Sequence, residues 1–287
     1  MAVAEPPARR PDRPVIGGRE INPTPGPPEL PPYGAPEVGL VIDEALATIT
    51  LNRPERLNAQ TPATWAALRR IGSVLPGTVR VVLVQGAGRA FSAGLDRQIF
   101  TAPPAGVPSL SQLAALEAGE ADRAIAGYQD AFGWLARSDL ISIAAVQGHA
   151  VGAGFQLALA CDLRVIADDA TFTMAEVALG LVPDLGGTRR LVELVGYSRA
   201  MDVCVTARPI AADEAMTMGL ASRLVPRSDL ATTALALARS ILGRPRNAVI
   251  EAKALLLQAS STATGAQEAA ERAAQHRLLR ELAAGPE

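Results

Sequence analysis

The stretch from Leu140 to Cys161, LISIAAVQGHAVGAGFQLALAC, decides the fold that we predict for this chain. It begins with an apolar run, Ile141 to Val146, which is long enough for one buried strand. The run breaks at Gly148, reaches Gly152-Ala153-Gly154 and continues with apolar residues at helical spacing. A strand that turns through glycines into a helix leaves free backbone N–H groups at the positive end of the helix dipole. The stretch therefore predicts a site for a developing negative charge.

The length of this stretch would also suit a membrane span. However, Gln147, His149 and Gln156 lie inside it, and Asp139 and Asp162 adjoin its two ends. Polar groups of this kind are costly inside a bilayer. We therefore predict a buried segment of a globular domain and no membrane partner.

The composition limits the classes of function. A chain of 287 residues can bury the core of one or two domains, and a net charge of −2 gives no general attraction to nucleic acid. Cys161 and Cys204 lie in apolar helical patterns, which is typical of core cysteines in a reduced, cytoplasmic protein. Because His149 and His276 are the only histidines, a histidine metal site or a Ser-His-Asp triad is disfavoured. We expect no metal, no nucleic-acid partner and a cytoplasmic location.

Residues 1–36 form a separate segment that contains eleven of the 22 prolines and few apolar residues. Proline interrupts helices and central strands, so we predict a disordered or polyproline-like tail. The segment lacks the apolar core of a signal peptide, and its acidic residues and lack of serine argue against a transit peptide. A docking role for a proline-rich motif is the alternative to a solvated extension.

Beyond the tail, strands alternate with helices, as in an α/β domain. The predicted strands are Val38–Asp43, Ala45–Leu51, Arg80–Gln85, Ile141–Val146 and Leu163–Ala167. Thr61 and Pro62 are typical of a helix start, and one long helix is predicted over Ser111–Arg137. After Gly186-Gly187 the pattern is helical; the candidates are Thr188–Val195, Ser198–Thr206, Ala212–Met218, Asp229–Leu242, Asn247–Ser260 and Ala266–Ala283. We expect these helices to serve oligomerisation; packing only within the subunit is the alternative.

Five motifs occur in one order along the chain. They are LNRPERLNA (51–59), AFSAGLD (90–96), GHAVGAGFQL (148–157), MAEVALGLVPDLGG (174–187) and ARPIAADEAMTMGL (207–220). Together they resemble the enoyl-CoA hydratase/isomerase (crotonase) family from about Val38 to the C-terminus. The resemblance implies an α/β spiral of ββα turns over residues 37–200. It also implies a C-terminal helical trimerisation region over residues 201–287, in a homotrimer or a dimer of trimers.

The family binds acyl-CoA thioesters and stabilises an enolate of the thioester carbonyl with two backbone N–H groups. The resemblance assigns these groups to Leu95, after Gly94, and to Ala153, at the helix start. Two fixed donors aimed at a developing oxyanion stabilise it strongly in a site closed to water. CoA is then part of the substrate, and no separate cofactor is expected.

The acid–base residues depart from the hydratase pattern of the family. Hydratases hold a water between two glutamates; one aligns with Gln156, which cannot accept a proton, and the other with Glu176. Some family isomerases keep only the second carboxylate, which moves a proton from carbon 2 to carbon 4. Asp184 aligns with an aspartate of family dienoyl-CoA isomerases, although it could instead cap the helix that follows.

We therefore predict Glu176, Asp184 and Gln156 as catalytic residues of an enzyme that isomerises a double bond in enoyl- or dienoyl-CoA. Three alternatives stay open at this point. The first is a hydratase in which Gln156 only orients water. The second is another family reaction, such as dehalogenation, decarboxylation or hydrolysis, and the third is a non-catalytic acyl-CoA-binding subunit.

The resemblance also implies a CoA site. Its residues in this sequence would be Arg53, Arg56, Ala93, Asp96 and Arg97. Gln98 stands where the family usually has a lysine, so Arg97 is the candidate substitute. Lys253 and Arg280 could reach the site of a neighbouring subunit, and the loop Thr101–Pro108 with the helix after it would cover the acyl pocket.

Overall fold

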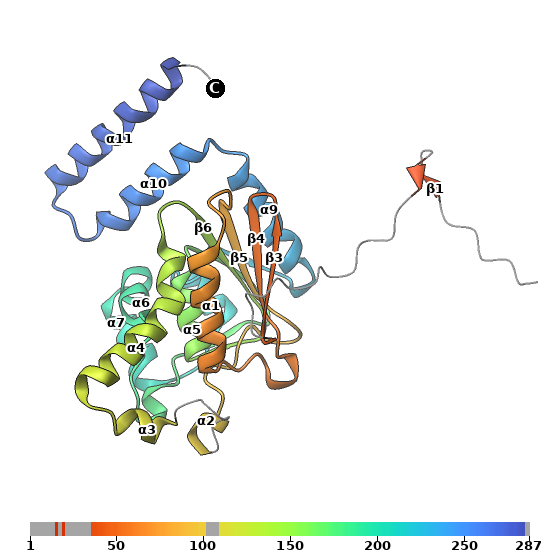
Figure 1. Cartoon of the computed structure of the whole chain (residues 1–287), viewed down its shortest axis with the longest axis vertical. Coiled ribbons are helices and arrows are strands. Elements are labelled where there is room, and N and C mark those ends of the chain that lie inside the picture. The colour runs from red at the N-terminus through yellow and green to blue at the C-terminus, as the bar shows by residue number, and fades with distance from the viewer. Residues whose placement is uncertain (1–14, 17–18, 21–35, 102–108, 285–287) are drawn as a thin grey trace, which may run out of the picture.

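Figure 1 shows the chain as a computed structural model, which describes residues 15–16, 19–20, 36–101 and 109–284. Within the first 35 residues it describes only β1 (Val15–Ile16) and β2 (Arg19–Glu20), which pair antiparallel. The rest of the predicted proline-rich tail and the loop 102–108 lie outside the described residues.

A six-stranded sheet forms the centre of the fold, in the order β11-β8-β6-β5-β4-β3. Its strands are β3 (Val38–Asp43), β4 (Leu46–Leu51), β5 (Val81–Gly86), β6 (Ile141–Val146), β8 (Leu163–Ala167) and β11 (Arg223–Val225). Only β3 pairs antiparallel, through a hairpin in which Glu44 has a positive φ of 50°. The predicted strands are confirmed to within a residue or two; the short β11 was not predicted.

The sheet is buried on both faces, which explains why its strands are almost continuously apolar. Along β5, Val82 and Val84 join the cluster that contains α1 (Pro62–Val74) and α5 (Ala153–Ala160). Val81 and Leu83 point to the other face and pack in a cluster with α9 (Leu230–Leu242). This alternation follows from the two-residue repeat of a strand.

A second, three-stranded sheet joins the central glycine turn to two later segments. Its order is β10-β9-β7, formed by β7 (His149–Val151), β9 (Thr171–Thr173) and β10 (Ile210–Ala211). The short strands escaped the sequence analysis because two or three residues give no periodic signal. Their pairing brings the start of α5 beside the segment after β9, where Glu176 lies.

Helix α1 begins where local signals predict. Thr61 caps α1 in a reciprocal pairing with Thr64, and Pro62 takes the first helical position. The remaining helices are α2 (Gln98–Thr101), α3 (Leu110–Ala114), α4 (Ala118–Gly133), α6 (Gly187–Val195), α7 (Tyr197–Thr206), α8 (Ala212–Thr217), α10 (Arg246–Ala259) and α11 (Thr264–Ala284), with short 3-10 turns η1 to η4 (Pro54–Arg56, Trp134–Ala136, Val177–Leu179, Arg227–Asp229) between them.

The single long helix predicted over Ser111–Arg137 is wrong. The structure divides this segment into α3, α4 and the 3-10 turn Trp134–Ala136. Helix α3 ends at Ala114 and α4 begins at Ala118, so residues 115–117 form a break between two separately started helices. An alanine-rich sequence has high helix propensity throughout, and propensity alone does not reveal where tertiary packing turns the chain.

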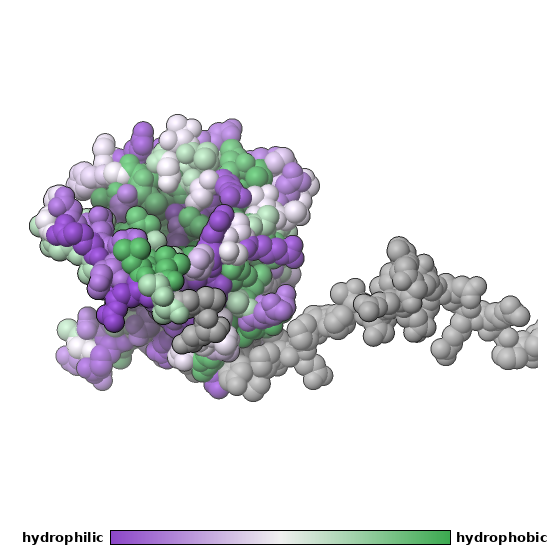
Figure 2. Space-filling view, turned by 90° about the horizontal axis from the view of Figure 1, so that it is seen from above, coloured by the Kyte–Doolittle hydropathy of each residue, from purple (hydrophilic) through white to green (hydrophobic). Residues whose placement is uncertain are grey.

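The two C-terminal helices extend beyond the sheet, and α11 lies alongside α10 (Figure 1). Among the described residues of α11 only Ala274 is buried, whereas Leu256 of α10 and Leu282 of α11 are 76% and 77% exposed. In Figure 2, which views the molecule from above, hydrophobic patches interrupt the polar surface. No helix in the described part of the chain is both long and apolar enough to cross a membrane.

Candidate active site

The candidate site lies where the loops after parallel strands β4, β5 and β6 meet. Carboxyl ends of parallel strands collect at one edge of a sheet, which is the usual place for a site in such folds. The loop after β4 pairs with the loop after β5 through an isolated bridge between Gln60 and Leu95. The latter loop pairs with β7 through Ser92 and Ala150. Three segments that are distant in sequence are thereby fixed side by side.

Two backbone N–H groups at this junction are free. Among the hydrogen bonds of the described residues, neither Leu95 N–H nor Ala153 N–H has a protein acceptor. Their segments touch, since a Cβ built on Gly94 would lie 2.5 Å from Val151 O and 3.6 Å from Ala153 N. Gly94 also has a φ of +83°, so only glycine fits without strain.

Glu176 follows β9 and lies against the start of α5. Gly152 N–H donates to Thr173 O at 2.8 Å, and a Cβ on Gly152 would lie 3.3 Å from Glu176 Oε1. The Glu176 backbone carbonyl accepts from Leu179 and Leu181, both at 2.9 Å, so the residue is held by its main chain. Its side chain is buried, and Oε2 has no hydrogen-bond partner among the residues that the structure describes.

Gln156 holds the other oxygen of this carboxylate. Its Nε2 donates to Glu176 Oε1 at 2.7 Å. Its Oε1 accepts from the N–H groups of Leu185, at 2.9 Å, and Gly187, at 3.2 Å. The side chain is 1% exposed. The carboxylate needs a donor and the two N–H groups need an acceptor, so the amide nitrogen must face Glu176 and the amide oxygen must face Leu185 and Gly187. Gln156 is therefore a brace between α5, the Glu176 segment and the start of α6.

The electrostatics favour a protonatable Glu176. Burial raises the pKa of its carboxyl, and the charge of Asp184 raises it further, against the opposing hydrogen bond from Gln156. Burial likewise raises the pKa of Asp184. A carboxylate with a raised pKa and an unpaired oxygen is suited to accept a proton and return it.

Asp184 does not serve as a helix cap. Helix α6 has Gly186 at its N-cap with no side-chain cap bond, and Gln156 occupies its first N–H. Asp184 is half-buried, its backbone carbonyl accepts from Gln129 of α4 at 2.8 Å, and its charge contributes to the raised pKa of Tyr128 after burial. The charge of Asp184 therefore acts on both Glu176 and Tyr128 of α4.

Comparison with known proteins identifies the family of the chain. Residues 41–284 match the family model for enoyl-CoA hydratase/isomerase. The chain belongs to the enoyl-CoA hydratase/isomerase family.

Named relatives of this family member include both reaction types. It is 35% identical over 201 residues to the probable enoyl-CoA hydratase echA8 of Mycobacterium tuberculosis, covering 69% of this chain and 72% of that protein. It is 32% identical over 228 residues to the peroxisomal Delta(3,5)-Delta(2,4)-dienoyl-CoA isomerase of Arabidopsis thaliana, covering 75% and 78%.

A solved structure supports the fold. A Thermobifida fusca protein classed as an enoyl-CoA hydratase, in complex with CoA, aligns with a TM-score of 0.82 at 47% identity, over 87% of this chain and 95% of that one. The crotonase-like α/β fold with a C-terminal helical region, expected from the motifs, is thereby confirmed.

Two of the residues expected at the family's CoA site bind each other. Arg53 Nη2 lies 2.9 Å from Asp96 Oδ2, its Nε lies 3.5 Å from Glu37 Oε1, and its Nη1 donates to Ala59 O. This cluster shapes the loops after β4 and β5, and any contact of Arg53 or Asp96 with CoA stays a prediction.

The other three residues expected at the CoA site, Arg56, Arg97 and Ala93, take no part in that ion-pair cluster. Arg56 and Arg97 are exposed, and no ion pair among the described residues engages either guanidinium. Ala93 is half-buried, and its N–H donates to Leu57 O at 2.8 Å. The exposed arginines are therefore available to anions, whereas Ala93 helps to close the loop.

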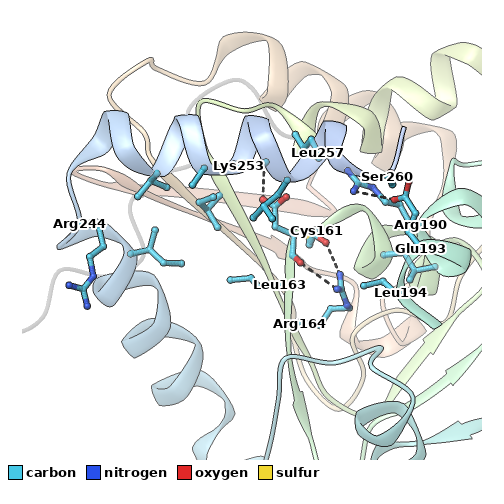
Figure 3. Close-up of a pocket in the computed structure, with 17 residues that line it drawn as sticks. Cys161, Leu163, Arg164, Arg190, Glu193, Leu194, Arg244, Lys253, Leu257 and Ser260 are labelled. Carbon is cyan, nitrogen blue, oxygen red and sulfur yellow. Dashed lines mark hydrogen bonds and ion pairs between the residues drawn. The ribbon is translucent and has the colours of Figure 1, made fainter. Parts of the chain in front are cut away.

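A separate cavity of about 510 Å³ lies under α10, beyond the C-terminal end of α5 (Figure 3). In its wall, Lys253 is 5% exposed and its Nζ donates to Leu135 O, Leu140 O and Asp162 Oδ2. The prediction that Lys253 reaches a neighbouring subunit's site is therefore wrong, because its charge is neutralised inside its own subunit. Arg280 is exposed, as that prediction requires.

The sequence analysis missed two residues beside the site. Cys204 of α7 was assigned to the core, but it is half-buried, and the Glu176 charge adds to the burial that raises its thiol pKa. The ring of Tyr128 of α4 packs against Trp65 in a tilted arrangement, with centroids 4.8 Å apart, and the Asp184 charge adds to the burial that raises its pKa. Neither has a local motif, because both reach the site by helix packing.

Proposed function

We propose that this protein isomerises a carbon–carbon double bond in an enoyl- or dienoyl-CoA thioester, with Glu176 as the acid–base residue. The observation that carries the proposal is the asymmetry of the Glu176 carboxyl group. Gln156 holds Oε1, whereas Oε2 is buried and has no partner in the described part of the chain. A single buried base with one free oxygen suits a reaction that removes and returns the same proton.

In the proposed reaction, Glu176 Oε2 removes a proton from carbon 2 of a 3-enoyl thioester. The electron pair of the broken C–H bond forms a double bond between carbons 1 and 2, and the carbonyl π pair moves onto the thioester oxygen, which gives a dienolate. The double bond between carbons 2 and 3 forms in the next step, when the π pair of carbons 3 and 4 takes up the proton. Return of the proton from Glu176 to carbon 4 re-forms the carbonyl and leaves a 2-enoyl thioester. No atom is gained or lost, so neither water nor an oxidant is required.

The Leu95 and Ala153 N–H groups are the proposed oxyanion donors. Neither group has an acceptor within the described ranges of the chain, and their segments are in contact at Gly94 and Val151. Ala153 is the first residue of α5, so the helix dipole adds to its donor. Donors fixed before the reaction stabilise the dienolate more than the neutral thioester, which is the requirement for catalysis.

Asp184 extends the proposal to dienoyl substrates. Shifting two conjugated double bonds requires proton delivery at carbon 6, farther from carbon 2 than one carboxylate reaches. Asp184 has a raised pKa and interacts electrostatically with Glu176, which supports it as a second proton donor. The dienoyl-CoA isomerase relative is consistent with this role.

Hydration of an enoyl-CoA is the second candidate, because several relatives are named hydratases. In that reaction the residue at position 156 would help to place water. Here the Gln156 carbonyl already accepts two backbone N–H bonds, and its amide donates to Glu176. This use of the side chain supports isomerisation over hydration.

We further propose that CoA phosphates bind Arg56 and Arg97. The arginines are exposed and have no ion pair in the described part of the chain.

We also propose that the protein is a homotrimer or a dimer of trimers. The exposed leucines of α10 and α11 would be covered by a neighbouring subunit. Light scattering would measure the assembly; a monomer would refute it.

The test of function is a panel of 3-enoyl-, 3,5-dienoyl- and 2-enoyl-CoA thioesters assayed for isomerisation and for hydration. We expect isomerisation to exceed hydration, and Glu176→Gln to lose about 10²- to 10⁴-fold of the rate. The matched control is Glu193→Gln, which removes a carboxylate at the distant cavity. Faster hydration than isomerisation by the wild type would overturn the assignment. Binding of CoA with no exchange of the C2 proton would indicate a non-catalytic subunit.

A further inference from the structure

The loop that carries Leu95 is held by a buried glutamine. Gln60 is 0% exposed; its N–H donates to Gly94 O at 2.6 Å, and its carbonyl accepts from Asp96 N–H at 2.8 Å. The two bonds flank Leu95. In a parallel pairing, the residue between two such bonds directs its own N–H to the opposite side. Gln60 therefore leaves the Leu95 N–H free and aimed away from itself.

The side chain of Gln60 makes a second connection to the same loop. Its Nε2 donates to Ser92 Oγ at 3.1 Å, and its Oε1 accepts from Trp65 Nε1 at 2.8 Å. Ser92 Oγ in turn accepts from Gly94 N–H at 3.3 Å and donates to Asn58 O at 2.8 Å. The residue before Leu95 is thus bonded on both its N–H and its carbonyl.

Ser92 also contacts the segment that carries the other donor. Its N–H donates to His149 O and its carbonyl accepts from Val151 N–H, both at 2.9 Å. A Cβ built on Gly154 would lie 2.5 Å from Ser92 O and 2.9 Å from Ser92 Oγ, so α5 packs directly on this serine. Ser92 lies between the two donor segments and links them.

We propose that Gln60 is a positioning residue, which fixes the spacing of the Leu95 and Ala153 N–H donors through Ser92. This inference rests on the proposed function, because it assumes that the two donors bind one oxyanion. Buried amides destabilise a core unless both ends are bonded, and Gln60 meets that condition entirely with groups of the donor loop and Trp65. Preorganised donors need such support, since small displacements lower rates steeply.

Acetoacetyl-CoA is a probe that separates positioning from folding. It is a β-keto thioester with an acidic C2 proton, and its enolate has an ultraviolet absorbance that the keto form lacks. Donors placed on the thioester oxygen increase the fraction bound as enolate. The absorbance of the bound ligand therefore reports the oxyanion donors, whatever the overall stability.

Four variants complete the design. Gln60→Met keeps the length of the side chain without its hydrogen bonds, Ser92→Ala removes the link, and the double variant tests whether they act together. Ser142→Ala is the matched control. Like Ser92, Ser142 is 0% exposed, donates to a carbonyl (Leu135 O, 2.9 Å) and accepts from a backbone N–H (Asp162, 3.0 Å), but it lies near the distant cavity.

We expect Gln60→Met and Ser92→Ala each to lower the enolate fraction and kcat by about tenfold, less than the 10²- to 10³-fold loss of a removed donor. KM should stay within about twofold of the wild-type value. The double variant should lose less kcat and enolate fraction than the product of the two single losses, because both residues act on one loop. Ser142→Ala should lower Tm and leave the enolate fraction unchanged. If Gln60→Met does not fold, Gln60→Glu tests the inference in its place. This variant keeps the acceptor for Trp65 but lacks the donor to Ser92.

Two results would overturn the inference while the proposed function stands. One is a wild-type enolate fraction in the Gln60 variant; the other is an equal loss in Ser142→Ala. A wild-type protein that binds acetoacetyl-CoA without forming enolate would overturn the proposed oxyanion site and the inference together.

Discussion

The amide nitrogen of Gln156 lies 2.7 Å from Oε1 of Glu176 and donates to it from a different element of the fold. The opposite end of the same amide holds the N–H groups of Leu185 and Gly187. One uncharged side chain thus restrains the proposed base, Glu176, and the loop that carries Asp184. Changes at this position should therefore affect chemistry and loop geometry together.

A second carboxyl beside Glu176 should change the reaction. In Gln156→Glu, two adjacent buried carboxyls would share a proton, because a like charge raises the pKa of its neighbour. We expect the acidic limb of the isomerisation profile to move to higher pH, and hydration of crotonyl-CoA to rise above the wild-type rate. Initial rates across the neutral pH range measure both. Gln156→Leu adds no charge and serves as the control; an unmoved pH limb in Gln156→Glu would contradict the contact.

Glu176 should reduce stability at neutral pH. Burial raises the pKa of this carboxyl above its unfolded value of about 4.3, so the folded state binds the proton more tightly. Its favourable contribution to folding is therefore complete at acid pH and is lost as pH rises through the folded-state pKa. We expect Glu176→Gln to have a higher Tm than the wild type at about pH 7.5 and a smaller advantage at about pH 4.5.

Calorimetry of both proteins at the two pH values measures that difference. Glu193→Gln, which loses an ion pair with Arg189 at 2.7 Å, should not gain stability at either pH. An advantage of Glu176→Gln that grows as the pH falls has the wrong sign for a raised pKa and would contradict it.

Gly187 should tolerate no side chain. A Cβ there would lie 2.7 Å from Gln156 Cγ and 3.0 Å from its Oε1, so Gly187→Ala must displace the brace. We expect kcat to fall about 10- to 100-fold, as misplacement of a catalytic group does. Gly133→Ala is the control, since nothing lies within 4 Å of its Cβ and its φ is −57°. That change should keep kcat and add about 0.5–1 kcal/mol of stability.

Lys253 should anchor α10 without affecting chemistry. Its ammonium is buried and bonded to two carbonyls and Asp162, so Lys253→Met leaves the Asp162 carboxylate, which is 16% exposed, without its cation. We expect the free energy of unfolding to fall by about 3–5 kcal/mol, with kcat and KM unchanged for the folded fraction. Urea denaturation measures the loss. Adding Asp162→Asn should restore part of it; full additivity of the two changes would argue against the ion pair.

Local signals were enough to predict most of the elements. Thr61 and Pro62 set the start of α1, and the apolar run Ile141–Val146 became β6 at the predicted residues. The residue types of the candidate site were also evident, including Glu176 and the glutamine at position 156. Caps, glycine turns and strand periodicity act over a few residues, so a single sequence reveals them.

Tertiary structure alone decided how those residues are used. It left one oxygen of Glu176 unpaired among the described residues and hydrogen-bonded Gln156 to the other oxygen. It also paired Gln60 with the residues on both sides of Leu95. It also divided the predicted long helix at residues 115–117. Each of these outcomes depends on contacts between segments far apart in the chain. The sequence by itself determined which chemical groups are available at the site, and the packing of distant segments decided which of their atoms remain free to react.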